Sequence, residues 1–174
     1  MKKILYLHGL ETRQGGRKVG FLSKDNYVHA PKIDYTRKDI FPFLIQIMDD
    51  FKPDLIIGSS MGGYAAYILS GFYGTPIIAF NPALHSRKFD LNLPSLLPVT
   101  LDKKMKNSNL HTTLPSKVKI ILGKEDTVIN PEKTKNYLNN NIKFPNTLEV
   151  EEVEGVGHRI PFNLFVDIYN KHIK

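Results

Sequence analysis

A serine flanked by glycines is the residue of this chain best suited to covalent chemistry. Residues 58–62 read Gly-Ser-Ser-Met-Gly and fit the pattern G-x-S-x-G, in which a serine lies on a sharp turn between a buried strand and a helix. An apolar run at 55–57 precedes the motif, and an alanine-containing, helix-compatible segment follows it. Such a turn projects the hydroxyl away from the backbone, where a base can activate it. We predict that Ser60 is a nucleophile and that Ser59 packs beside it or forms a wall of the site.

A serine nucleophile also needs amide donors for the oxyanion that forms on its substrate. Residues 5–10 read Leu-Tyr-Leu-His-Gly-Leu, which places a His-Gly pair where an early buried strand ends. We expect the backbone N–H groups of Leu10 and Met61 to form the oxyanion hole. The same reasoning gives four further candidates for substrate contact near this strand end, which are His8, Gly9, Glu11 and Arg13.

The acid that would orient a catalytic histidine follows a later apolar strand. Residues 118–122 predict a buried strand, and 123–126 read Gly-Lys-Glu-Asp. Asp126 therefore lies beyond the carboxyl end of a strand, which is the edge of a parallel sheet where ligands bind. Glu125 is the near rival, but the shorter side chain of Asp126 suits a fixed turn better. The structural alternative is that Asp126 only caps that turn.

The base is predicted to be His158, because two glycines at 155 and 157 let the chain bring it back over the sheet before the last helix. The chain has six histidines, and an isolated histidine is more often structural or exposed, so position must discriminate among them. The other five are His8 in the oxyanion strand, His172 at an end expected to fray, and His29, His85 and His111, which lack the glycine-framed setting.

The elements that must position these groups alternate between apolar runs and helical patterns, which favours a parallel sheet covered on both faces. We expect strands at 3–7, 27–30, 54–58, 76–80, 118–122 and 148–153. Apolar residues recur at helical spacing over 40–51, although Pro42 leaves the start of that helix open. A further helix opens at Asn130-Pro131-Glu132, and the last one begins near Pro161. Residues 83–117 show no periodicity and are expected to form a lid-like excursion.

Length and composition bound the remaining possibilities. The 174 residues are 41% hydrophobic, which suffices for one core but not for two ordinary domains, so we expect a single domain over 1–174. The absence of cysteine excludes disulfides, thiolate metal sites and a cysteine nucleophile. The apolar run that ends at His8-Gly9 is too short for a signal peptide, and no run reaches the roughly 20 residues that cross a bilayer. We expect a soluble, cytoplasmic protein.

The net charge of +7, from 24 basic and 17 acidic residues, does not predict a nucleic-acid partner. The basic residues are scattered, their densest cluster is at 103–106, and no basic run is interleaved with aromatic residues. A solvated surface explains the charge, and we expect neither nucleic-acid nor membrane binding. No metal cluster or phosphate-binding loop is visible either, so no cofactor is expected.

The chain resembles the α/β-hydrolase superfamily and within it is similar to the small YqiA-type esterase family. The resemblance spans nearly the whole chain and is carried by the segments 6–9, 58–66, 81–83, 123–126 and 155–158. The order Ser60, Asp126, His158 is the order of this superfamily. The resemblance implies a minimal α/β-hydrolase fold, with about six mostly parallel strands in a three-layer α/β/α sandwich and no full cap domain. The strand at 3–7 leaves no room for the two strands that come first in larger relatives.

The resemblance implies a serine esterase with a Ser-His-Asp triad and an undefined physiological substrate. We expect hydrolysis of small-acyl carboxylic esters or thioesters, with the small-molecule substrate as the partner. Two alternatives stay open from the sequence: an acyltransferase that uses the same triad, and a non-catalytic binding module with this fold. The sequence leaves the oligomeric state open.

Overall fold

A computed structural model describes residues 1–10, 12, 15–37, 39–84, 117–141 and 148–173. Six parallel strands form one sheet in the order β2-β1-β3-β4-β5-β6. The strands are β1 (Lys3–Leu7), β2 (Tyr27–His29), β3 (Leu55–Ser59), β4 (Ile77–Phe80), β5 (Val118–Gly123) and β6 (Leu148–Val153). The expectation of mostly parallel strands is therefore confirmed, and all six are parallel.

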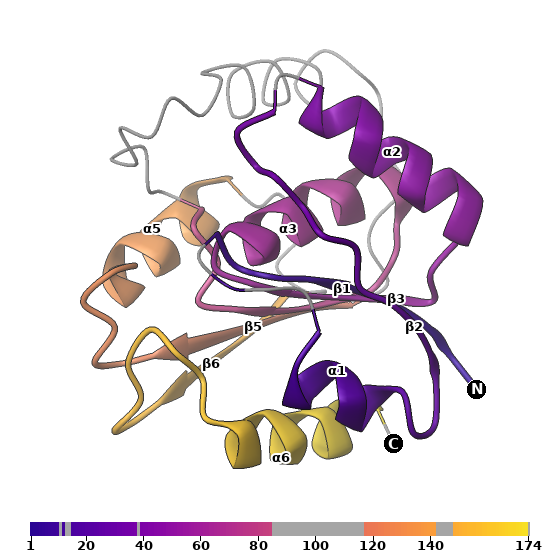
Figure 1. The fold of residues 1–174 in the computed structure, drawn as a ribbon. Helices are drawn as coiled ribbons and strands as arrows, with labels where there is room; N and C mark the ends of the chain where they lie inside the picture. The colour runs from indigo at the N-terminus through magenta and orange to yellow at the C-terminus, as the bar shows by residue number, and fades with distance from the viewer. Residues whose placement is uncertain (11, 13–14, 38, 85–116, 142–147, 174) are drawn as a thin grey trace.

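Helices cover both faces of the sheet and make three layers (Figure 1). On one face lie α2 (Ile40–Phe51), α3 (Met61–Tyr73) and α5 (Pro131–Asn141). On the other face lie α1 (Arg17–Leu22) and α6 (Phe162–Ile173). Crossovers between parallel strands are right-handed, so the direction in which the chain moves along the sheet decides which face the connecting helix covers. From β1 to β2 the chain moves toward one edge of the sheet, and in the later connections it moves toward the other edge. For this reason α1 lies on the opposite face from α2, α3 and α5.

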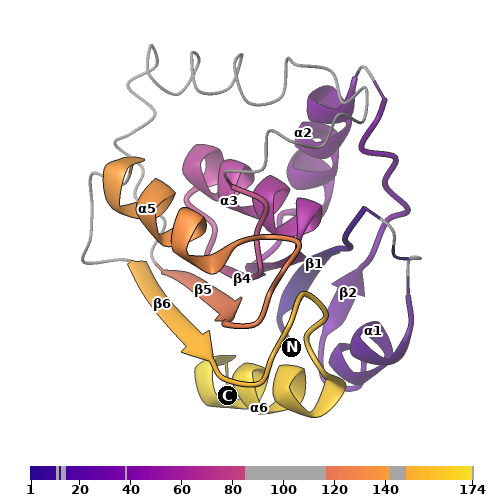
Figure 2. The same cartoon turned by 90° about the vertical axis from the view of Figure 1, so that its left-hand side faces the viewer.

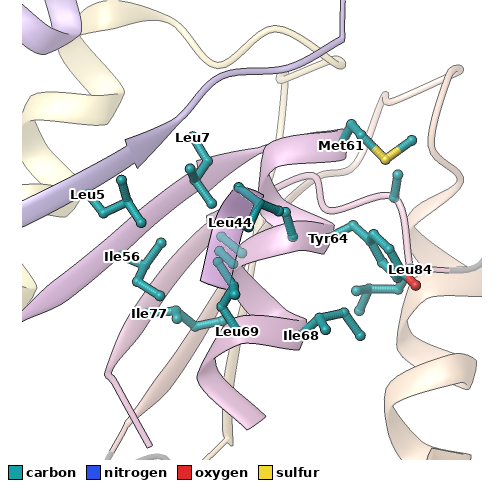
Figure 3. Packing of buried hydrophobic residues seen from close by; sticks show 14 of the residues in the cluster. Leu5, Leu7, Leu44, Ile56, Met61, Tyr64, Ile68, Leu69, Ile77 and Leu84 are labelled. Atoms are coloured by element: carbon teal, nitrogen blue, oxygen red, sulfur yellow. The ribbon is translucent and has the colours of Figure 1, made fainter. Parts of the chain in front are cut away.

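Alternation along each strand fills two cores. In β1, Leu5 and Leu7 point toward the face covered by α2 and α3, whereas Ile4 and Tyr6 point toward α1 and α6. Figure 3 shows the first of these cores, in which Leu5 and Leu7 lie against side chains from β3, β4, α2 and α3. Strands buried on both faces read as continuous apolar runs, which is why the sequence located them.

The predicted elements are confirmed with small shifts at their ends. The strands expected at 27–30, 54–58 and 76–80 begin or end one residue away from the observed bounds, and β5 continues through Gly123. Pro42 lies in the first turn of α2, where its missing N–H costs no helical hydrogen bond. Asn130 accepts the Lys133 N–H at 2.9 Å and caps α5 as expected. Apart from its ends, the excursion at 83–117 lies outside the described residues.

Among the residues that the structure describes, none of the helices combines the length and the apolar composition that crossing a membrane requires.

The edge strand β6 and the helix α6 are joined to β5 by a cluster of charged side chains. The side chain of Lys119, on β5, is only 2% exposed and its ammonium lies between the carboxylates of Glu149 and Glu151, at 2.8 Å from the latter.

The structure corrects the expectation that His172 lies at a frayed end. Its side chain is 8% exposed, and its Nε2 is 3.6 Å from Glu151 Oε2, too far for a hydrogen bond. Burial and the Lys119 ammonium lower the pKa of His172 below its ordinary value.

We predict that replacing His172 makes stability less dependent on pH. Because the pKa of His172 is lower in the folded protein than in the unfolded chain, the unfolded chain takes up a proton first as the pH falls below about 6.5. The wild-type protein therefore loses stability over that range. The His172→Gln variant should show a flatter curve of urea midpoint against pH between about 7 and 5.

His29→Gln, which removes an imidazole from the opposite edge strand β2, is the matched control. An unchanged slope in the His172→Gln variant would contradict the prediction. The pKa values of Glu149 and Glu151 are lowered, chiefly by hydrogen bonds from Lys119. Their stabilising contribution is present above about pH 4.3 and is lost below it as they become protonated, so it does not interfere with the measurement.

Candidate active site

Ser60 lies on a strained turn between β3 and α3. Its backbone has φ 54° and ψ −115°, a conformation that costs on the order of 1–3 kcal/mol for a residue other than glycine. Three backbone hydrogen bonds hold it there. The Ser60 N–H donates to the Phe80 carbonyl at 2.9 Å, and the Ser60 carbonyl accepts from Tyr64 at 3.0 Å and from Ala83 at 3.1 Å. The turn directs the side chain out of the strand, as the sequence predicts.

The glycines of the motif are required because backbone approaches backbone at this turn. A Cβ on Gly58 would lie 2.2 Å from the Gly62 carbonyl oxygen, and a Cβ on Gly62 would lie 2.1 Å from the Leu7 carbonyl oxygen. Neither contact is compatible with a side chain. Gly9 differs, because its added Cβ would lie 3.4 Å from the Ser60 Cβ, in ordinary contact. That distance also places the backbone after β1 directly beside the serine.

Ser60, His158 and Asp126 form a continuous hydrogen-bonded chain. His158 Nε2 lies 3.1 Å from Ser60 Oγ, and His158 Nδ1 lies 2.8 Å from Asp126 Oδ2. Because a carboxylate accepts, Nδ1 carries the proton and Nε2 is free to accept the serine proton. The His158 side chain is 25% exposed, whereas that of Asp126 is fully buried. The site thus has a sheltered anion and an accessible base.

Asp126 also fulfils the alternative role that its sequence position allowed. Its Oδ1 accepts the N–H groups of Val128 and Ile129, both at 2.8 Å, so it caps the turn while Oδ2 binds His158. With Oδ1 held in this way, the second oxygen has a fixed direction. The rival acid, Glu125, is used differently: its Oε2 accepts the Val156 N–H at 2.7 Å, and its own N–H donates to the Val156 carbonyl at 3.0 Å.

Glu125 therefore fastens the loop that carries His158 to the loop that carries Asp126. The two loops approach so closely that a Cβ on Gly123 would lie 2.3 Å from the Val156 carbonyl oxygen. Asn81, which follows β4, adds hydrogen bonds to both loops. Residues 81–83 carry part of the family resemblance, but the sequence assigns no role to Asn81, because its partners lie far away in the chain.

His8 has a different place from the one expected of a substrate contact. Its side chain is buried, its Nδ1 donates to the Gly9 carbonyl at 2.7 Å, and its Nε2 accepts the Ile33 N–H at 3.0 Å. Both ring nitrogens are therefore engaged within the protein. Tyr35, which the sequence reasoning missed, donates its hydroxyl to the His8 carbonyl at 2.6 Å. These contacts fix the shape of the loop after β1, which is the role that the structure gives to His8.

Of the two expected oxyanion donors, Met61 follows Ser60 in the chain, and Leu10 belongs to the segment after β1 that lies beside it. Met61 is the first residue of α3, so its N–H has no partner within the helix and lies at the end where the helix dipole favours negative charge. Leu10 follows Gly9, whose backbone lies beside Ser60. Ser59 is the last residue of β3 and is partly exposed. Glu11 and Arg13 lie outside the described residues.

A second cluster has the residue types of a metal site. The ligand atoms of Glu149, Glu151 and His172 lie within 4.8 Å of one another, near the amino ends of β5 and β6 and away from Ser60. The buried ammonium of Lys119 already lies between the two carboxylates. This cluster therefore has an internal cation, and we assign it to the packing of β6 and α6.

Comparison with known proteins identifies a family. The model of an uncharacterised protein family, UPF0227, matches residues 3–146, which include Ser60 and Asp126. The chain belongs to this family. No curated protein matches the chain.

Solved structures that resemble this member of UPF0227 share the α/β-hydrolase fold. A monoacylglycerol lipase from Paleococcus ferrophilus is 15% identical, with a TM-score of 0.65, and the match covers 97% of this chain and 93% of the lipase. A putative α/β-superfamily hydrolase from Xanthomonas campestris is 15% identical, with a TM-score of 0.63 and coverage of 98% and 99%. An S-formylglutathione hydrolase from Agrobacterium tumefaciens is 15% identical, with a TM-score of 0.61 and coverage of 99% and 82%. At these identities the likeness establishes the fold.

We predict that Gly62→Ala destabilises the protein strongly and displaces Ser60. The added methyl group would collide with the carbonyl oxygen of Leu7 at 2.1 Å, and overpacking that forces the backbone to move costs about 1–3 kcal/mol, occasionally more. Urea unfolding monitored by circular dichroism measures the loss.

Gly20→Ala is the control for this substitution. Gly20 lies within α1, and apart from its chain neighbours and the backbone of its own helix a Cβ there would meet nothing within 4 Å. Alanine in a helix interior is better than glycine by roughly 0.5–1 kcal/mol, so this variant should be as stable as the wild type or more stable. Equal stabilities of the two variants would refute the steric account of the turn.

Proposed function

We propose that this protein is a serine hydrolase that cleaves carboxylic esters or thioesters of small acyl groups. The observation that carries the proposal is the chain of contacts from Ser60 Oγ to His158 Nε2 at 3.1 Å and from His158 Nδ1 to Asp126 Oδ2 at 2.8 Å. A serine next to a base that is itself oriented by a buried carboxylate is the arrangement of nucleophilic acyl transfer. The α/β-hydrolase fold supports a hydrolase, and the structural relatives named above include a lipase and an S-formylglutathione hydrolase.

In the proposed acylation, His158 Nε2 takes the hydroxyl proton as Ser60 Oγ bonds to the acyl carbon. The carbonyl oxygen becomes an oxyanion, which the N–H groups of Leu10 and Met61 receive. When the tetrahedral intermediate collapses, the bond to the alkoxide or thiolate breaks, and the leaving group takes the proton from His158. The Asp126 carboxylate stabilises the imidazolium while that proton is held.

Deacylation repeats these steps with water as the nucleophile. His158 accepts a proton from water as the water oxygen attacks the acyl carbon, and then returns the proton to Ser60 Oγ as the ester bond breaks and the acid leaves. An acyltransferase would differ only in the acceptor that replaces water. We favour hydrolysis because the side chain of His158 is partly open to solvent, so water can reach the base.

Ser60→Ala is predicted to abolish covalent labelling by a fluorophosphonate and hydrolysis of p-nitrophenyl acetate. Asp126→Asn is the sharper test of the triad, because its Oδ1 can still accept from Val128 and Ile129 while its amide donates toward His158 and imposes the wrong tautomer. This change should lower kcat by about ten thousandfold with the fold retained. Intact activity in either variant would refute the assignment, and absence of labelling in the wild type would favour a binding module.

The second prediction of the proposal concerns the substrate. In a panel of p-nitrophenyl esters and acyl thioesters of graded length, kcat/KM should be highest for short acyl groups, since the chain offers little material to enclose a long tail. Adding alcohols or amines to the assay separates the two acyl-transfer reactions. Free acid as the sole product supports hydrolysis, whereas formation of a new ester or amide would support the acyltransferase.

A further inference from the structure

Asn81 holds the backbone around Ser60 in place through an unusual bend. It follows β4 directly and has φ 43°, a left-handed conformation that asparagine tolerates better than most residues. The bend lets the chain contact the serine from two sides, because Phe80 accepts the Ser60 N–H at 2.9 Å and Ala83 donates to the Ser60 carbonyl at 3.1 Å. The N–H of Asn81 itself donates to the Ile121 carbonyl at 2.8 Å.

The side chain of Asn81 joins the two loops that carry the acid and the base. Its Oδ1 accepts the Gly123 N–H at 2.7 Å, at the start of the loop to Asp126. Its Nδ2 donates to the carbonyls of Gly157 and His158, both at 3.0 Å. Because an N–H lies on one side of the amide and two carbonyls lie on the other, the orientation of the amide is fixed. Asn81 is 1% exposed, so these bonds are shielded from bulk solvent.

We infer that Asn81 is a positioning residue that sets the distance between His158 Nε2 and Ser60 Oγ. Asp126 fixes the rotation of the imidazole, but it does not hold the backbone from which the imidazole extends. That backbone follows Gly155, which has φ 69°, and Asn81 binds it at the carbonyl of His158 itself. Asn81 thus links the peptide groups of the nucleophile, the loop of the acid and the backbone of the base. The catalytic consequence rests on the proposed function, whereas the geometric one does not.

A buried asparagine elsewhere in the protein provides a matched control. Asn26 is 8% exposed, and its Nδ2 donates to the Leu22 carbonyl at 2.9 Å and to the Tyr169 hydroxyl at 2.8 Å. These contacts join the end of α1 to α6, on the sheet face away from the core beneath α3. Asn26→Ala removes two buried hydrogen bonds, against the three that Asn81→Ala removes, so it causes a loss of stability of the same kind without touching the triad.

Kinetics with p-nitrophenyl acetate, at a temperature where circular dichroism shows every variant folded, test the catalytic consequence. Asn81→Ala should lower kcat by about 10- to 100-fold with KM nearly unchanged, because a shift of about 1 Å in a catalytic group costs about that much. Asn26→Ala should keep kcat within about twofold of the wild type. A kcat of Asn81→Ala equal to that of Asn26→Ala would overturn the inference.

Asn81→Asp adds a test by pH and covers the case in which the alanine variant does not fold. The carboxylate can still accept from Gly123, but it faces two carbonyls without a proton to donate. The ratio of its kcat to that of the wild type should rise as the pH falls, because the protonated acid donates one of the lost bonds. A ratio that does not change with pH in this variant would contradict the assigned contacts.

A spectroscopic measurement separates this inference from the proposed function. The proton on His158 Nδ1, which is shared with Asp126, should give a far-downfield NMR signal that His158→Gln removes. The signal should weaken or shift in Asn81→Ala and stay in place in Asn26→Ala. A wild type that forms no Ser60 adduct would refute the proposed function alone, whereas an unchanged signal in Asn81→Ala would refute the positioning role alone.

Discussion

The left-handed backbone of Ser60 is a conformation that serine does not hold without support, and its neighbours in the fold supply that support. The carbonyl of Phe80, at the end of β4, accepts its N–H, and the close packing of Gly62 against Leu7 of β1 fixes the start of α3. Both flanking strands are needed, so β3 lies between β1 and β4 in the sheet. The chain reverses its direction of travel across the sheet beside this strand, which is where open α/β sheets form their binding crevices.

The acid and the base reach the serine because parallel strands bring their carboxyl ends to one edge. Asp126 follows β5 and His158 follows β6, and Figure 2 shows the arrowheads of these two strands with the loops that continue from them. Gly123 is a position of close approach, against Val156, whereas Gly155 has a positive φ of 69°. Each catalytic candidate therefore carries a local mark: a strand end, a glycine and a polar side chain. This is why the mutual contacts of Ser60, His158 and Asp126 and the six strands could be predicted from the sequence.

This local mark does not separate the catalytic candidates from the residues that hold them in place, because Asn81, Glu125 and His8 are also polar residues that follow strand ends. Asn81 binds partners 42 and 76 positions away in the chain, and its role arises only from the way the strands are arranged. Glu125 and His8 show that residue type alone is not sufficient to identify a catalytic residue. Both are types suited to catalysis, but both tie loops together instead. Local sequence gives the chemistry that a side chain is able to do, but the partners that occupy it depend on the tertiary fold.

The position of His158 at the edge of the sheet would link the proposed catalysis to local unfolding. His158 follows β6, which has a neighbouring strand on one side only, and the cluster around Lys119 holds that strand and α6 against β5. An opening that releases β6 and α6 while the other five strands stay paired would leave Ser60 on its turn without a proton acceptor. The rate of turnover would then depend on the fraction of molecules in which β6 and α6 are docked against β5, rather than on the global stability of the sheet. Ion pairs remote from the serine would thereby contribute to the reaction through the population of a competent state.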